Sequence, residues 1–172
     1  MNPATGGVRA SGVAGRLGMH ASVRESAKNR IPALRGGWEH FPHEADMGVR
    51  GHGDTLPDAF AAVAEATIAV VTDPAGIDPA ERVEFACSAS DPDLLLYDFL
   101  NAIVYEMAVG GRLFSRFRVE IEGETLRAEA WGEPVDGRRH QPAVEIKGAT
   151  FTQLAVRQAA DGSWIAQCVL DI

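Results

Sequence analysis

The 172-residue chain has only two cysteines, few aromatic residues and no long apolar run. No segment reaches the 18 or more apolar residues of a membrane-spanning helix. Cys87 and Cys168 lie far apart and form no CxxC pair, so the favoured interpretation is two buried free thiols in a reducing cytosol. The chain also lacks a nucleophile elbow, a Gly-rich phosphate loop and an HExxH motif. It therefore carries none of these standard catalytic motifs.

The net charge of −8 is unevenly distributed along the chain. Residues 1–37 contain six basic residues and one acidic residue, and residues 38–172 contain ten basic and 23 acidic residues, a net charge of −13. Because an acidic domain repels phosphate backbones, we expect no autonomous binding to nucleic acid. If RNA is involved, another protein should hold it.

The first 37 residues are rich in Gly, Ala, Ser and Arg and show no sustained periodicity. They predict a basic, disordered tail, followed by one folded domain over residues 38–172. A lineage-specific extension, a start at Met19 and an Arg-rich transit-like presequence all remain open. The tail lacks the apolar segment of a secretory signal, so we expect a cytoplasmic protein without a membrane partner.

Apolar periodicity predicts the elements of the domain. Trp38–Val49 is expected to form a strand with a polar interruption. A helix should begin at the N-cap Thr55, and a second should follow Asp91-Pro92 and end at Gly110-Gly111. The remaining strand-like segments alternate apolar and polar residues. The order β-α-β-α-β-β-β-β predicts an α+β, two-layer domain in which two helices pack on one mostly antiparallel sheet.

The stretch "HFPHEADMGV", residues 40–49, places two histidines and two carboxylates within seven residues. Together with His52 and His140 these histidines raise the possibility of a zinc site, but their spacing matches no standard ligand pattern. On an alternating strand, His40 and His43 would point to opposite faces. We therefore favour polar roles at edges or loops for most of them.

Two acidic residues lie at the ends of apolar strands, and the chain terminus adds a third anion. Asp46 precedes apolar Met47, Asp171 follows an apolar strand, and Ile172 carries the terminal carboxylate. Brought together, these groups would form a site for Ca²⁺ or Mg²⁺. The alternative is that Asp171 is a solvated terminal residue. Lys147 likewise either lies on the solvent face of a strand or sits beside the acidic group, contacting a phosphate or a partner carboxylate.

Seven short segments, in order and spacing, resemble the archease family. They are "HEAD" (43–46), "GDTLPDAF" (53–60), "DLLLYDFLN" (93–101), "LF" (113–114), "WGE" (131–133), "VEIKGATF" (144–151) and the terminal "DI". The resemblance covers residues 38–172. It is carried most specifically by "EIK" together with a chain that ends at "DI".

The resemblance implies a function that composition does not show. Archeases are accessory proteins of the RtcB-type RNA ligase, a GTP- and metal-dependent enzyme of tRNA splicing and RNA repair that passes through a guanylylated histidine. An archease promotes that guanylylation and multiple turnover without being the ligase itself. The motif match implies a divalent-cation site, expected to bind calcium, at Asp46, Asp171 and Ile172. Lys147 matches a functionally important lysine, and His43 and Glu44 are further candidate functional residues.

The first motif departs from the family pattern. The family usually has Asp-His-Thr-Ala-Asp, whereas Pro42 stands here at the first Asp and Glu44 at the Thr. Metal affinity or partner contact is therefore expected to differ from the typical member. Two other function classes stay open. One is a metal-dependent phosphohydrolase that uses the Asp46 site with His43 as general base, and the other is a calcium-stabilised structural module.

Overall fold

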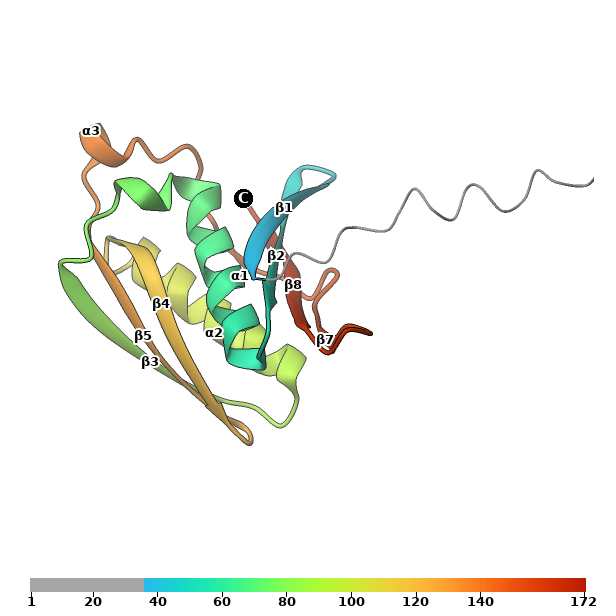
Figure 1. Cartoon of the computed structure of the whole chain (residues 1–172). Helices are drawn as coiled ribbons and strands as arrows, with labels where there is room; N and C mark the ends of the chain where they lie inside the picture. Colours follow the sequence, from blue (N-terminus) through green and yellow to red (C-terminus); the bar gives the residue numbers. More distant parts are fainter. Residues whose placement is uncertain (1–35) are drawn as a thin grey trace, which may run out of the picture. The chain divides into compact units, whose positions relative to one another are not determined.

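The computed structural model describes residues 36–172, in which two antiparallel sheets lie on either side of two long helices (Figure 1). One sheet has the strand order β1-β2-β8-β6, with β7 also paired to β8, and the other has the order β3-β5-β4. The elements are β1 Gly37–His43, β2 Asp46–Gly53, α1 Leu56–Val71, η1 Pro74–Gly76, β3 Glu81–Ser88, α2 Pro92–Ala108, β4 Arg112–Glu122, β5 Thr125–Pro134, α3 Gly137–His140, β6 Gly148–Ala149, β7 Ala155–Gln158 and β8 Trp164–Asp171. The predictions for the tail concern residues that lie almost entirely outside the described part.

Local sequence fixes both ends of the long helices. Thr55 and Asp58 form a reciprocal capping box at the start of α1, with a proline in the first turn. The Asp91 side chain caps α2 by accepting hydrogen bonds from two backbone N–H groups. Each helix ends just before the predicted stop, α1 before Asp73-Pro74 and α2 before Gly110-Gly111.

The core lies between the sheets and is built around aromatic side chains. The rings of Phe60 and Phe99, one from each long helix, have centroids 6.3 Å apart, and Phe85 meets Phe99 edge-on at 6.1 Å. Phe114 of β4 completes this group at 5.9 Å from Phe85. These contacts join both helices to the three-stranded sheet.

Two glycines of β2 allow α1 to approach the five-stranded sheet closely. A Cβ atom on Gly51 would lie 2.3 Å from the backbone nitrogen of Val63, and one on Gly53 would lie 2.4 Å from that of Ala59. The glycines at positions 51 and 53 therefore belong to a strand that touches a helix backbone.

The α+β class, with antiparallel sheets packed by two long helices, is confirmed. The strands form two sheets rather than one because α1 is buried on most of its circumference, so a single sheet could not cover it. The single strand predicted over Trp38–Val49 is wrong. It is a hairpin, and the polar interruption is the turn between β1 and β2. Within the described residues, no helix is long and apolar enough to span a membrane.

Both cysteines of the described chain are free thiols. Cys168 is fully buried on β8, and burial raises its pKa to about 12. Cys87 is half-buried, and burial followed by the charge of Asp98 raises its pKa too. The expected burial thus holds for Cys168 and only partly for Cys87, and neither thiol has the lowered pKa of a reactive cysteine.

Candidate functional site

The register between β2 and β8 brings Asp46 next to Asp171. The antiparallel ladder between the two strands runs as far as Met47 and Leu170, and Asp46 and Asp171 are the next residue of each strand at that end. The last paired residues of an antiparallel ladder bring the residues that follow them close together. Two predicted ligands, distant in sequence, are therefore neighbours.

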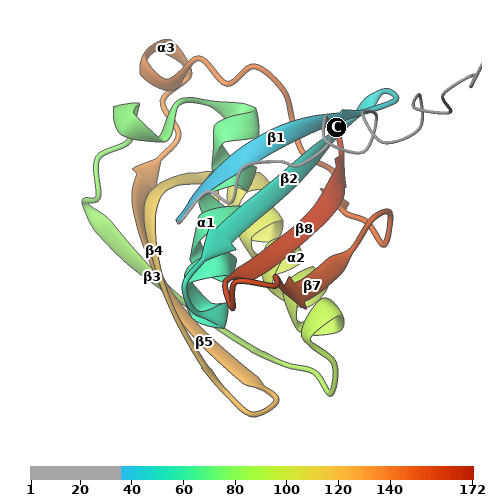
Figure 2. The same cartoon turned by 45° about the vertical axis from the view of Figure 1, so that its right-hand side comes forward.

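Ile172, the residue expected to supply the third carboxylate, lies at the same point. The Ile172 side chain packs against the hydrophobic core, which holds the end of the chain beyond β8. The two views of the ribbon show the C-terminus beside the end of the β1–β2 hairpin (Figures 1 and 2). The terminal carboxylate of Ile172 thus lies on the same side of the domain as Asp46 and Asp171.

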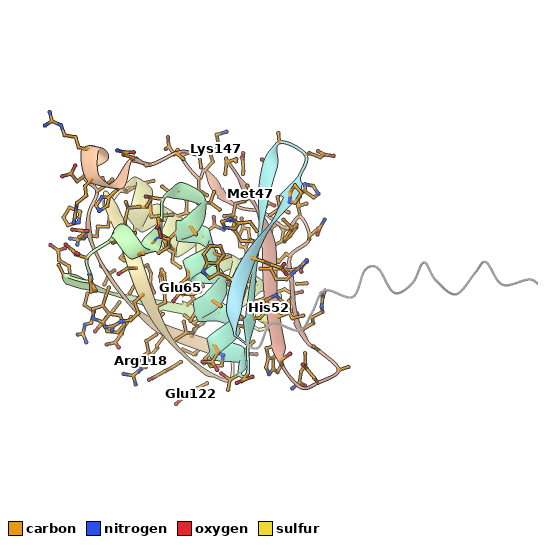
Figure 3. The ribbon with its side chains drawn as sticks, turned by 45° about the horizontal axis from the view of Figure 1, so that its top comes forward. Met47, His52, Glu65, Arg118, Glu122 and Lys147 are labelled. Atoms are coloured by element: carbon orange, nitrogen blue, oxygen red, sulfur yellow. The ribbon has the colours of Figure 1, made fainter. Side chains whose placement is uncertain are left out.

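Lys147 reaches this carboxylate group from the next segment of the sheet. Its Nζ donates a hydrogen bond to an oxygen of the Ile172 terminus at 3.0 Å and lies 3.6 Å from Asp171 Oδ1. Its backbone N–H donates to the Asp171 carbonyl at 2.8 Å. Figure 3 shows Lys147 and Met47 toward one end of the domain, with Arg118 and Glu122 toward the other. The structure thus brings Lys147 to two of the predicted ligands, and the functions of all of them stay predictions.

His43 and Glu44 lie at the hairpin turn beside the same group. His43 is paired with Asp46 across the hairpin, and its Nδ1 is buried without a hydrogen-bond partner among the described residues. Glu44 is exposed and has φ of +52°, a conformation that strains a residue with a side chain. Pro42 is paired with Met47, so it projects from the opposite face to Asp46 and brings no ligand there.

The donor set fits a hard divalent cation. Two Asp side chains and a terminal carboxylate supply oxygen atoms, the ligands that Ca²⁺ and Mg²⁺ prefer. The Asp46 carboxylate makes no hydrogen bond or ion pair within residues 36–172. In the same residues, no group of three His, Cys, Asp or Glu side chains is arranged to hold a metal. Such a site would therefore depend on the terminal carboxylate of Ile172, and it would have to accommodate Lys147.

The other histidines have separate partners. His40 Nε2 contacts the Ala66 carbonyl of α1, and His52 Nε2 lies 3.2 Å from a Glu39 carboxylate oxygen. His140 lies in α3, far along the chain. Each of these contacts is a polar interaction of the kind favoured from the spacing of the histidines.

Two polar residues of α2 hold the segments that follow Lys147. The sequence alone assigned them no role. Asn101 Oδ1 accepts a hydrogen bond from the Ala149 N–H at 3.0 Å, and its Nδ2 donates to the Tyr97 carbonyl at 3.0 Å. Asp93 Oδ1 accepts from the Val156 N–H at 2.6 Å. Both residues occur in "DLLLYDFLN". A polar residue on a half-buried face of a predicted helix is the feature of the sequence that could have indicated their role.

A second set of missed residues anchors the segment before Lys147. His140 is buried, and its Nδ1 accepts the Asp136 backbone N–H at 2.8 Å, so the proton is on Nε2, which donates to Glu133 at 3.0 Å. Glu133 also accepts the Asp78 backbone N–H and pairs with Arg139. The hydrogen bond from Asp78, supported by Arg139 and His140, lowers the pKa of Glu133 to about 2. The glutamate of "WGE" therefore fixes α3 to the three-stranded sheet.

Comparisons with known proteins agree with these features. Residues 38–172 match the Archease protein family (MTH1598/TM1083). The chain is 38% identical to Protein archease of Pyrococcus furiosus over 139 residues, which is 78% of this chain and 98% of the relative. It is 35% identical to Protein archease of Aeropyrum pernix over 142 residues, covering 80% and 98%.

Two solved structures share the fold. The solution structure of Methanobacterium thermoautotrophicum protein 1598 matches with a TM-score of 0.69 at 27% identity, covering 79% of this chain and 99% of that one. The crystal structure of a Thermotoga maritima protein, described as an archease and possible chaperone, matches with a TM-score of 0.50 at 20% identity, covering 78% and 96%. The family match and the identity to its members over nearly their whole length show that this chain belongs to the archease family.

Proposed function

We propose that this protein is an accessory protein that activates an RtcB-type RNA ligase, promoting guanylylation of the ligase and its multiple turnover in tRNA splicing and RNA repair. Membership of the archease family supports an accessory role, and the Thermotoga relative is described as a possible chaperone, a protein that acts on other proteins. The observation that carries the proposal is the meeting of Asp46, Asp171, the terminal carboxylate and Lys147 at one end of the domain.

This group is accessible to a partner. The side chains of Lys147 and Asp171 are 65% and 50% exposed, and the Asp46 carboxylate has no partner within the described residues. A bound divalent cation, which we expect to be calcium, would neutralise the carboxylates. Asp46, Asp171 and Ile172 would hold it, while Lys147, His43 and Glu44 would face the ligase.

An apolar groove next to Lys147 provides a docking surface. Its volume is about 450 Å³, and it lies between the end of α2, the start of β4 and residues 142–146, which lead directly into Lys147. Three apolar side chains on or beside it are strongly exposed: Val109 at 67%, Val135 at 44% and Val144 at 37%. Exposed apolar surface beside a charged group is typical of a protein-binding site.

The charge of the domain favours a protein partner over RNA. Residues 38–172 carry a net charge of −13, which repels a phosphate backbone but attracts a basic, RNA-handling enzyme. RNA would then be contacted only through the ligase.

Multiple-turnover ligation of RNA by the ligase of the same organism, with GTP and a divalent cation, tests the proposal. We expect a large gain in turnover from this protein, lost in Asp46→Ala. Glu122→Gln removes an exposed carboxylate toward the other end of the domain and should keep the gain. The proposal is wrong if the wild-type protein has no effect on turnover.

Two control measurements address the other function classes. Intrinsic phosphoester hydrolysis that disappears in Asp46→Ala would favour the phosphohydrolase. A melting temperature that falls on removal of calcium, with ligase turnover unaffected by this protein, would favour the structural module.

A further inference from the structure

We propose that Lys147 is a built-in competitor of the cation, so that the Lys147 ammonium and a divalent ion exclude each other from the same carboxylate oxygens. This inference rests on the cation site of the proposed function. It goes beyond that function by making Lys147 a determinant of cation affinity, and by making the cation a switch for the position of Lys147.

The contacts of Lys147 Nζ are contacts with predicted ligands. The ammonium lies 3.0 Å from an oxygen of the Ile172 terminus and 3.6 Å from Asp171 Oδ1, so its single positive charge is shared between two of the three carboxylates. The third, that of Asp46, has no partner within residues 36–172. The lysine thus already occupies the place of a cation on one side of the site.

Simultaneous occupancy is electrostatically unfavourable. A calcium ion binds oxygen at about 2.3–2.6 Å, so it would approach an ammonium bonded to the same oxygens to within about 4–5 Å. At that separation the repulsion between a divalent and a monovalent cation in water corresponds to roughly thirtyfold in affinity, and salt reduces this figure. Binding of the ion should therefore expel the lysine.

The lysine can leave without disturbing the fold. Its side chain is 65% exposed, and ion pairs between exposed groups contribute little stability. Its backbone remains fixed, because the Lys147 N–H donates to the Asp171 carbonyl and Gly148 is paired with Asp171. Only the side chain has to rotate, and it would then point its ammonium toward a partner.

Reciprocity follows from this competition. A carboxylate or phosphate of the partner that binds Lys147 removes the competitor and so raises the affinity for the cation. Bound cation in turn raises the affinity for the partner, and the two factors are equal. Cation binding and docking would thus be coupled through one side chain.

Calorimetric titration of the full chain with CaCl₂ tests the competition directly. Lys147→Met removes the charge and keeps an unbranched side chain that is one atom shorter, and we expect it to bind calcium about five- to thirtyfold more tightly than the wild type. Arg127→Met, which removes an exposed cation on β5, is the matched control and should leave the affinity unchanged.

A labelling experiment on the wild-type chain gives an independent measurement. Lys147 is the only lysine in residues 36–172, so acylation of its amine can be followed by mass spectrometry of a single peptide. We expect its labelling rate to rise with calcium and to saturate at the concentrations seen in calorimetry. In Asp46→Asn the rise should shift to higher calcium concentrations.

The outcomes are distinct. Equal or weaker calcium binding by Lys147→Met, or calcium protection of Lys147 against labelling, overturns the competition. If neither protein binds calcium there is no cation site, which also overturns the inference, while the ligation assay still decides the accessory role separately. If Lys147→Met does not fold, the labelling of the wild type decides alone.

Discussion

Replacing Asn101 with leucine tests how the strand after Lys147 is held in place. The strand β6 has only two residues and is paired with β8 along one edge. On its other side, Asn101 Oδ1 accepts the Ala149 N–H at 3.0 Å and Nδ2 donates to the Tyr97 carbonyl at 3.0 Å, with a longer contact of 3.5 Å to the Ala149 carbonyl. The Asn101 side-chain amide thus makes the hydrogen bonds to β6 that a neighbouring strand would otherwise make.

The expected loss of stability follows from these bonds. Leucine has nearly the same size but can neither accept from Ala149 nor donate to Tyr97. Losing two neutral hydrogen bonds, and leaving a partly buried N–H unpaired, should cost about 2–3 kcal/mol. For a domain of this size that corresponds to a fall in melting temperature of roughly 6–12 °C.

Urea unfolding followed by far-ultraviolet circular dichroism measures the loss, and hydrogen exchange at the Ala149 amide locates it. Gln158→Leu, which removes an exposed amide with one hydrogen bond on β7, should change stability by less than about 0.5 kcal/mol. If Asn101→Leu unfolds at the wild-type urea concentration and Ala149 keeps its protection, Asn101 does not hold β6.

Two further predictions concern the chain terminus and acid stability. Appending three residues after Ile172 moves the terminal carboxylate by about 10 Å, so calorimetry should show calcium affinity weakened at least tenfold, as for Asp171→Ala; unchanged affinity would remove Ile172 from the site. The lowered pKa of Glu133 means that its contribution to stability is complete above about pH 4.5 and is lost as the pH falls toward about 2. Melting temperatures measured across that range should fall more steeply for the wild type than for Glu133→Gln, and parallel curves would contradict the assigned hydrogen bonds.

The helices could be predicted from the sequence because their determinants are local. Thr55 and Asp91 cap the helices from positions next to them, and the stop signals follow at once. The hairpin was missed because its turn carries Glu44 at positive φ instead of the glycine or asparagine that usually marks such a turn.

The candidate site could not be derived from residue patterns alone. Alternation shows that Asp46 and Asp171 end strands, but it does not show which strands pair or in which register. That information is set by the packing of the whole domain. The resemblance to a family supplied the grouping, and the register of β2 and β8, paired as far as Met47 and Leu170, then placed the two residues at the same end of the ladder.

The missed residues share a physical role that explains their polarity. Residues 141–147 form no regular strand, and β6 is very short, so much of the backbone around Lys147 has no ladder to satisfy its hydrogen bonds. After Lys147, the Asn101 side chain accepts a hydrogen bond from the Ala149 N–H. Before it, the backbone N–H groups of Ala143 and Lys147 donate to the carbonyls of Val71 and Asp171, and the Glu133–His140 side-chain pair holds the end of α3. Lys147 is thus carried by a segment held by separate polar contacts, which fix its backbone beside Asp171 while its side chain stays 65% exposed. That combination of a fixed backbone and an exposed side chain is what the proposed competition with a cation requires.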